Sequence, residues 1–121
     1  KVWATSMRSL NYDIARYAWI GDYLDPSTFL DIMASDSGNN QTGWKNAEYD
    51  RLLTAAKTTA DPAQRYAYFQ RCEAILAEEC PIAPIYFYSR NNLRLTSVKG
   101  WYGNLLDFHP LKGVTLEKNG K

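Results

Sequence analysis

The sequence predicts a mixed α/β fold, in which helices flank a small mixed sheet. Two neighbouring segments in the middle of the chain have helical periodicity and clear start signals, and shorter apolar runs on either side have the character of strands. The 121 residues, 45% of them hydrophobic and 22% charged, are enough for one folded domain. Because few strands remain to complete a sheet, we expect its other strands to come from sequence outside these residues.

The first twenty residues predict a short helix and then a strand. Val2, Trp3 and Met7 suggest the helix. Residues 11–20 (NYDIARYAWI) show the alternation of a strand, which we expect to be largely buried and to end at Gly21.

A second short helix follows this strand. Asp25 is suited to the N-cap and Pro26 to the first helical position, and apolar residues continue as far as Met33. Residues 35–43 (SDSGNNQTG) contain no core-type residue and predict a polar loop.

Two longer helices come next. Asn46 is the expected N-cap of the first, whose apolar face has the spacing i, i+3, i+4, i+7 and consists of Tyr49, Leu52, Leu53 and Ala56. Asp61 can cap the second helix with Pro62 at its first position, and Gln64 can reach back as in a capping box. The buried stripe expected on this second helix consists of Tyr68, Cys72, Ile75 and Leu76.

Two strands and a tail are expected in the last forty residues. Residues 82–88 (IAPIYFY) predict a strand that is bulged or at a sheet edge, because Pro84 has no N–H to donate. Residues 98–101 suggest another short strand, and residues 112–121 a weakly structured tail.

The two cysteines, Cys72 and Cys80, lie eight residues apart. On a continuous helix their separation is about 12 Å, whereas a disulfide needs Cα atoms about 4.4 to 6.8 Å apart. We expect Pro81 to stop the helix and to push Cys80 toward an extended conformation. A bond requires the helix to end early, so the sequence leaves the question open.

Composition excludes several functions. The net charge of +1 comes from 14 basic and 13 acidic residues without a block of like charge, so no nucleic-acid partner is expected. No run of about 18 apolar residues predicts a membrane span. One histidine and no Cys-x-x-Cys leave too few ligands for a metal, and no motif indicates a cofactor.

Several short motifs occur in a characteristic order between about residues 8 and 112. They are YDIAR at 12–16, WIGDYLDP at 19–26, Asn39-Asn40 with Gly43-Trp44, Tyr49-Asp50 with Leu52-Leu53, the stretch from Arg65 to Tyr86 with its EAIL and PIAPIY segments, and Val98-Lys99-Gly100 with Asn104. Each motif alone is weakly specific. In this order and spacing the sequence resembles the oligopeptide- and dipeptide-binding members of the extracellular solute-binding proteins.

The resemblance implies a fold and a place in a longer protein. Members of this family have two lobes that close on a peptide like a hinged clamp. We therefore expect residues 1–121 to be the C-terminal portion of one lobe of a type II periplasmic-binding-protein fold. Residues 1–97 then belong to the lobe and residues 98–121 to a return segment and tail. The chain is expected to be a single domain and a fragment that lacks the signal region.

The resemblance also implies a function, which is not that of an enzyme. The expected role is the substrate-binding component of an ABC-type oligopeptide importer, exported to the periplasm or anchored at the cell surface. Its expected partners are a peptide ligand, the membrane permease of the importer and the remainder of the receptor, with the intact protein a monomer.

Two charged residues are candidates for holding the ends of a peptide. In the family's peptide binders, the Asp of the Trp-x-x-Asp-Tyr motif holds the free α-amino group, and Asp22 stands at that position. Its alternative role is to cap the turn before Pro26. Arg16 stands where some members meet the C-terminal carboxylate of a short peptide, and its alternative is an ion pair with Asp13 or Asp22.

Aromatic side chains complete the expected ligand site. The resemblance implies that Trp19 packs on peptide side chains beside Tyr23, and Tyr86 and Tyr88 are candidates for lining the cleft; core packing is the alternative. Residues 16–22 are the candidate strand edge for binding a peptide backbone. Some members carry a cysteine where this chain has isoleucine, directly after the motif tryptophan, so the disulfide that they form is absent here.

Other functions remain open at this point. The same fold can bind a nickel chelate, haem or an oligosaccharide, although an Asp suited to an ammonium group favours peptides. A hydrolase could use Asp22 and Asp25 as an acid–base pair. A structural or adaptor domain would instead place its aromatic residues in a protein interface.

Overall fold

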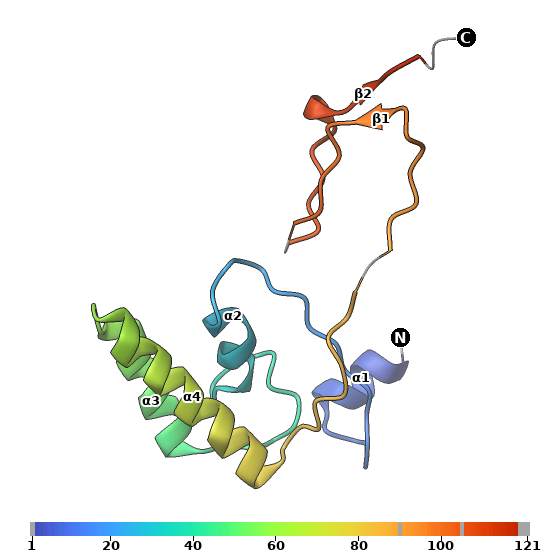
Figure 1. Ribbon diagram of the computed structural model, residues 1–121. Coiled ribbons are helices and arrows are strands. Elements are labelled where there is room, and N and C mark those ends of the chain that lie inside the picture. Colours follow the sequence, from blue (N-terminus) through green and yellow to red (C-terminus); the bar gives the residue numbers. More distant parts are fainter. Residues whose placement is uncertain (1, 90, 105, 119–121) are drawn as a thin grey trace. The chain divides into compact units, whose positions relative to one another are not determined.

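The computed structural model of the protein describes residues 2–89, 91–104 and 106–118. The chain forms two compact units, Lys1–Pro84 and Ile85–Lys121, and each is treated by itself below. The α-helices belong to the first unit and the short strands to the second (Figure 1). The expected division into a lobe at 1–97 and a return segment at 98–121 concerns the longer protein and stays a prediction.

The first unit is helical, as most of its sequence predicts. Its elements are α1 (Val2–Arg8), α2 (Ser27–Leu30), the 3-10 turn η1 (Asp31–Met33), α3 (Ala47–Thr58) and α4 (Pro62–Glu79). α3 and α4 lie side by side as a helical hairpin, and α2 packs against α4 (Figure 1). Both short helices and both long helices expected from the sequence are therefore confirmed.

One hydrophobic core holds α2, η1, α3 and α4 together. Its buried residues are Leu30, Met33, Tyr49, Leu52, Leu53, Ala56, Phe69, Cys72 and Ile75. The predicted face of α3 is buried throughout. On α4, Cys72 and Ile75 are buried as expected, whereas Tyr68 and Leu76 are only partly buried and Phe69 occupies the core position that the sequence prediction missed.

The long helices begin where their capping residues predict. The Asn46 side chain accepts a hydrogen bond from the N–H of Tyr49 at 3.0 Å. The Asp61 carboxylate accepts from the N–H of Ala63 at 3.0 Å, and Pro62 is the first helical residue. Each side chain satisfies an N–H group that the first turn of a helix leaves without a carbonyl partner.

The capping box expected at the start of α4 is not formed. The Gln64 side-chain oxygen accepts a hydrogen bond from the hydroxyl of Thr59 at 2.9 Å. The N–H of Asp61, which the glutamine was expected to bind, donates to that same Thr59 oxygen at 3.4 Å. The preceding threonine therefore takes the place that the prediction gave to Gln64.

The end of α4 differs from the expectation for a residue before proline. Cys80 is the C-cap and has left-handed backbone angles, φ 50° and ψ 44°, rather than an extended conformation. Its N–H donates to the carbonyl of Leu76 at 2.9 Å, as in helices that end with a left-handed residue. The cap outweighs the steric preference that Pro81 imposes. Cys72 and Cys80 are both free thiols, the first buried and the second exposed.

The strands expected at 11–20 and 82–88 are not formed, and this prediction is wrong for the described structure. Neither segment pairs with another strand, and neither is buried: Ile14 is 94% exposed and Phe87 fully exposed. A strand needs a hydrogen-bonded neighbour. Within the described residues, the sheet consists of only two strands, both at the C-terminal end of the chain.

The second unit contains this small sheet. β1 (Val98–Lys99) and β2 (Thr115–Leu116) are antiparallel, with Val98 opposite Leu116 and Lys99 opposite Thr115. A 3-10 turn, η2 (Leu111–Gly113), precedes β2. The strand expected at 98–101 is confirmed in its first half, whereas residues 111–116 are more structured than the tail that the sequence predicted. No helix among the described residues has the length and apolar character needed to cross a membrane.

Candidate functional site

The turn that leads into α2 is held by its own backbone and by Asp25. The N–H of Asp25 donates to the carbonyl of Tyr23 at 3.0 Å, and the N–H of Thr28 donates to the carbonyl of Asp25 at 3.1 Å. The Asp25 carboxylate accepts from both the N–H and the hydroxyl of Ser27, at 2.9 and 2.6 Å. The Asp25 carboxylate therefore binds the first N–H of α2, but the predicted capping positions are wrong by one residue: Pro26 is the N-cap and Ser27 the first helical residue.

Gly21 lets this turn lie tightly against α2. A Cβ atom at this position would lie 3.0 Å from the Thr28 side chain and 3.1 Å from the Phe29 ring. The next residue is fixed from the same side, because the N–H of Asp22 donates to the Thr28 hydroxyl at 2.9 Å. The backbone that carries the Asp22 side chain is thus anchored to the helix.

The Asp22 carboxylate itself is exposed and uncommitted. It makes no hydrogen bond or ion pair with any residue that the structure describes, and only its backbone N–H takes part in the turn. The capping role that was the alternative for Asp22 is carried by the carboxylate of Asp25 instead.

Asp25 is paired with Arg65 of α4. The guanidinium donates two parallel hydrogen bonds to the two carboxylate oxygens, at 2.6 and 2.8 Å. Hydrogen bonding to Arg65 holds the pKa of the Asp25 carboxyl far below its usual range. A general acid must carry a proton, which this carboxyl does not at neutral pH. The arrangement gives no support to a hydrolytic pair of Asp22 and Asp25.

Arg65 is the site-supporting residue that sequence reasoning missed. It lies 40 positions after its partner Asp25, so no local pattern joins the two. The sequence does show an arginine in the first turn of a predicted helix, but this position by itself does not indicate which carboxylate the arginine binds.

Arg16 is exposed and forms no ion pair with the described residues. The alternative ion pair of Arg16 with Asp13 or Asp22 is absent among the described residues. The expectation that Arg16 lies on a buried strand is also wrong, because residues 11–20 form an extended, mostly exposed segment. Its guanidinium is therefore available to a ligand.

Trp19 is half-buried beside two other aromatic rings. Its ring stacks on Tyr17 with centroids 6.4 Å apart and planes 22° apart, and Tyr17 stacks on Trp3 of α1 at 6.5 Å. The indole N–H is shielded from solvent and has no acceptor among the described residues. A shielded donor without a partner is costly, which is the situation that a ligand carbonyl would relieve.

The three tyrosines of the expected site lie in different units. Tyr23 is 46% exposed, and its hydroxyl lies 3.2 Å from the hydroxyl of Ser27. Tyr86 and Tyr88 belong to the second unit, where they are 64% and 66% exposed. Arg16, Trp19, Asp22 and Tyr23 thus share one segment of the first unit, and the contribution of Tyr86 and Tyr88 stays a prediction.

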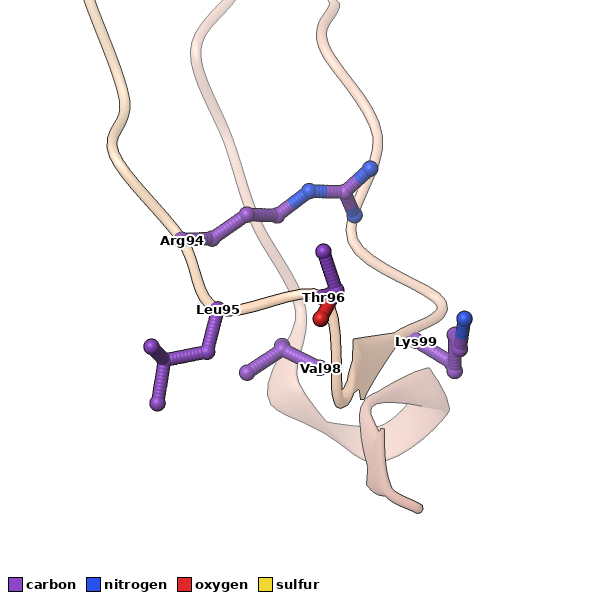
Figure 2. Close-up of a pocket in the computed structure, with 5 residues that line it drawn as sticks. All are labelled: Arg94, Leu95, Thr96, Val98 and Lys99. Atoms are coloured by element: carbon purple, nitrogen blue, oxygen red, sulfur yellow. The ribbon is translucent and has the colours of Figure 1, made fainter. Parts of the chain in front are cut away.

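A shallow hollow in the second unit is not a competing site. Figure 2 shows the residues that line it, which are Arg94, Leu95, Thr96, Val98 and Lys99. Both of its cationic side chains are engaged: the Arg94 guanidinium donates to the carbonyl of Trp101 at 2.8 Å, and Lys99 pairs with Glu117 at 3.5 Å. Among the described residues, no group of histidine, cysteine and carboxylate side chains is placed to bind a metal ion.

Comparison with known proteins finds relatives that match most of the chain. No protein-family model matches it. The oligopeptide-binding protein OppA of Bacillus subtilis (strain 168) is 37% identical over 100 residues, which are 82% of this chain and 18% of that protein. The periplasmic murein peptide-binding protein MppA of Escherichia coli (strain K12) is 38% identical over 101 residues, 84% of this chain and 19% of that protein. Over most of its length the chain is thus homologous to one region of the oligopeptide-binding proteins.

A solved structure agrees with this assignment. The murein tripeptide binding protein MppA of Escherichia coli matches with a TM-score of 0.88 and 34% identity, over 98% of this chain and 23% of that one. The fold is therefore part of the α/β fold of the oligopeptide-binding proteins, as the sequence predicted. The chain spans about a fifth of the length of the relatives it matches. These relatives are binding proteins and not enzymes.

Proposed function

We propose that this chain is part of a receptor that captures short peptides by their backbone and termini and delivers them to an ABC-type importer. The observation that carries the proposal is the Asp22 carboxylate, exposed and uncommitted on an anchored turn. It occurs in a chain 35–38% identical to proteins named for binding oligopeptides, dipeptides and murein peptides.

The chemistry of the segment suits the two ends of a peptide. Asp22 accepts charge-assisted hydrogen bonds from the α-ammonium group, and Arg16 offers a planar fork to a carboxylate. In open water such a pair contributes only about 0 to 1 kcal/mol. The affinity of Asp22 for an ammonium group therefore depends on water being excluded when the remainder of the receptor closes over the ligand.

The remaining candidate residues provide the rest of the contact. Trp19 and Tyr23 pack on the first side chains of the peptide, and the indole N–H of Trp19, which has no partner among the described residues, donates to a peptide carbonyl. Tyr86 and Tyr88 are further candidates for lining the cleft of the intact receptor. A site that fixes termini and backbone leaves side-chain preference loose.

The location follows from the same relatives. Those named periplasmic indicate an exported protein. We extend this to a receptor in the periplasm or anchored at the cell surface, which is monomeric when intact and works with a membrane permease.

Calorimetric titration of the full-length receptor tests the proposal. Free tri- to pentapeptides should bind about 10 to 100 times more tightly than the same peptides with acetylated N-termini, which corresponds to one charged hydrogen-bonded contact. Asp22→Asn should remove this difference. Asp36→Asn, which changes another exposed aspartate of the same unit, should keep it.

Two results would contradict the proposal. Equal binding of free and acetylated peptides would remove the role of Asp22. Absence of peptide binding would indicate a different ligand, such as the nickel chelates, haem or oligosaccharides that the same fold can bind.

A further inference from the structure

Each of the three nitrogens of the Arg65 side chain donates a hydrogen bond, and together these bonds join the ligand-bearing turn to the helical core. Two of its nitrogens bind the carboxylate of Asp25, and Nε donates to the carbonyl of Ala56 near the end of α3 at 3.2 Å. The guanidinium also lies over the ring of Phe69, 4.7 Å from its centre. Since Phe69 is buried in the core, Arg65 connects the turn, α3 and α4 at one point.

A chain of hydrogen bonds leads from this point to the proposed ligand residues. The Tyr23 hydroxyl lies 3.2 Å from the Ser27 hydroxyl, which donates to Asp25 at 2.6 Å, and Asp25 is held by the Arg65 fork. The backbone of Asp22 is tied to the same short helix through Thr28. Displacement of Asp25 therefore changes the position of both Asp22 and Tyr23.

Arg65 also sets the charge of the turn. Asp22 and Asp25 are two carboxylates three residues apart, and both side chains belong to the same turn. The guanidinium neutralises Asp25, whose side chain is 27% exposed, while Asp22 has no counter-ion among the described residues. The turn therefore presents one uncompensated negative charge, which matches one ammonium group.

We propose that Arg65 is a positioning residue of the peptide α-amino site: it holds the turn at residues 22–28 and leaves Asp22 as the single uncompensated carboxylate that selects a free ammonium group. The proposal rests on the proposed function, because it names a further residue of that same site. It adds that the preference for a free N-terminus depends on a side chain that does not touch the peptide.

The test compares Arg65→Lys with Arg71→Lys in the full-length receptor. Lysine keeps the positive charge but has no planar fork for two parallel bonds. Arg71 lies on the same helix, is half-exposed, and pairs with Glu48 and Glu78 at 3.6 and 3.3 Å rather than with a residue of the turn. The readout is the ratio of the dissociation constants for acetylated and free peptides, measured where circular dichroism shows each variant to be folded.

Arg65→Lys should lower this ratio by about tenfold, which is the effect of misplacing one charged contact, and Arg71→Lys should leave it unchanged. A loss of thermal stability with an unchanged ratio would show Arg65 to be merely structural and would overturn the proposal. If Arg65→Lys does not fold, the same ratio is measured in Asp25→Asn. The freed Arg65 cation should then repel the ammonium group and lower the ratio, and an unchanged ratio overturns the proposal.

The failure of the proposed function is distinguishable from the failure of this inference. If the wild-type receptor binds free and acetylated peptides equally, the α-amino site itself is absent. If the wild type discriminates and loses discrimination in Asp22→Asn, but Arg65→Lys behaves as Arg71→Lys does, only the positioning role of Arg65 is wrong.

Discussion

Asn40 shows how a single side chain can order a polar loop. Its amide nitrogen donates to the carbonyls of Met33, Ala34 and Trp44 at 3.2, 3.2 and 2.9 Å. Its amide oxygen accepts from the N–H and the hydroxyl of Thr42 at 3.2 and 2.8 Å. These hydrogen bonds fix the path of the loop between η1 and α3, together with the packing of Ala34 and Trp44 against the core.

Replacing Asn40 by alanine should therefore destabilise the first unit by about 1 to 3 kcal/mol, because the carbonyl groups it binds lose their partner. The midpoint of urea unfolding, followed by circular dichroism, measures the loss. Asn39→Ala is the matched control: its side chain is exposed and bonds no described residue. Equal midpoints for the two variants would contradict the role given to Asn40.

At the residue scale, the sequence could name the ligand candidates but not their supports. Asp22 and Arg16 were identified by the motif that they occupy, and the structure shows both exposed and without a described counter-ion. Two features depend on residues that only the folded chain brings together. They are the pairing of Asp25 with Arg65 and the hydrogen bonds of the Asn40 side chain. Turn chemistry predicts that such polar residues are used locally, not with which partner.

At the scale of elements, helices were predictable because their signals are local. Asn46 and Asp61 cap within three residues of their own positions, and the apolar face of α3 follows directly from its spacing. The stripe of α4 was less clear, since aromatic residues at 66, 68 and 69 allow more than one face to be apolar. In the folded chain Phe69 is the aromatic residue of the three that is buried in the core.

Strands were poorly predicted because pairing is not local. Residues 11–20 and 82–88 have strand-like composition, yet they have no partner within the described residues. β2 has a composition that indicates little by itself, and it is a strand because β1 lies beside it. Strand character depends on neighbours and burial more than on the segment alone.

The β1–β2 sheet should depend on Gly100, the glycine that directly follows β1. Gly100 has φ 78°, and a Cβ atom there would lie 1.9 Å from the carbonyl oxygen of Gly113. Gly100→Ala thus combines an unfavourable left-handed conformation, about 1 to 2 kcal/mol, with a backbone clash. The amide of Glu117, which donates to Ser97 at 2.8 Å, should exchange with solvent at least about 5 to 30 times faster.

The control for this experiment is another glycine of the same unit. Gly103→Ala places a methyl group in open space and should leave the exchange of the Glu117 amide unchanged. If the Glu117 amide of Gly100→Ala exchanges as slowly as that of the wild type, the sheet does not depend on Gly100.

At the scale of the whole molecule, the two units differ in what stabilises them. The first has a core in which Tyr49 and Cys72 are fully buried. No described residue of the second is fully enclosed, and its closest ring packing is the stack of Trp101 on His109 with centroids 4.1 Å apart. The sequence did not predict the boundary at Pro84, because no composition change or flexible linker marks it.

Burial of Cys72 should make the first unit sensitive to alkali. Burial raises the pKa of this thiol to about 11, with smaller contributions from Glu73 and Asp31. In the unfolded chain the thiol ionises near its usual pKa of about 8.5. The stabilisation is therefore complete below about pH 8.5 and is lost as the pH rises toward about 11, because only the unfolded state gains the thiolate.

Urea unfolding at about pH 7.5 and about pH 10 measures this loss. The decrease should be smaller in Cys72→Ala, while Cys80→Ala, which removes the exposed thiol, should behave as the wild type does. Tyr49, whose pKa is also raised by burial, leaves part of the decrease in every variant. An identical decrease in wild type and Cys72→Ala would show that the buried thiol does not titrate on unfolding.

The loop around Asn40 also determines in which hosts the chain can be produced. Asn40-Gln41-Thr42 is an acceptor sequence for N-linked glycans in eukaryotic secretory cells. A glycan replaces one of the two hydrogens on the Asn40 amide nitrogen. Only one hydrogen then remains for the carbonyls of Met33, Ala34 and Trp44, which share two hydrogens in the unmodified chain. Replacing Thr42 to remove the acceptor sequence would also disturb the loop. The Thr42 hydroxyl donates to the Asn40 side chain and accepts from the N–H of Trp44. A bacterial host, which leaves this amide unmodified, preserves the loop.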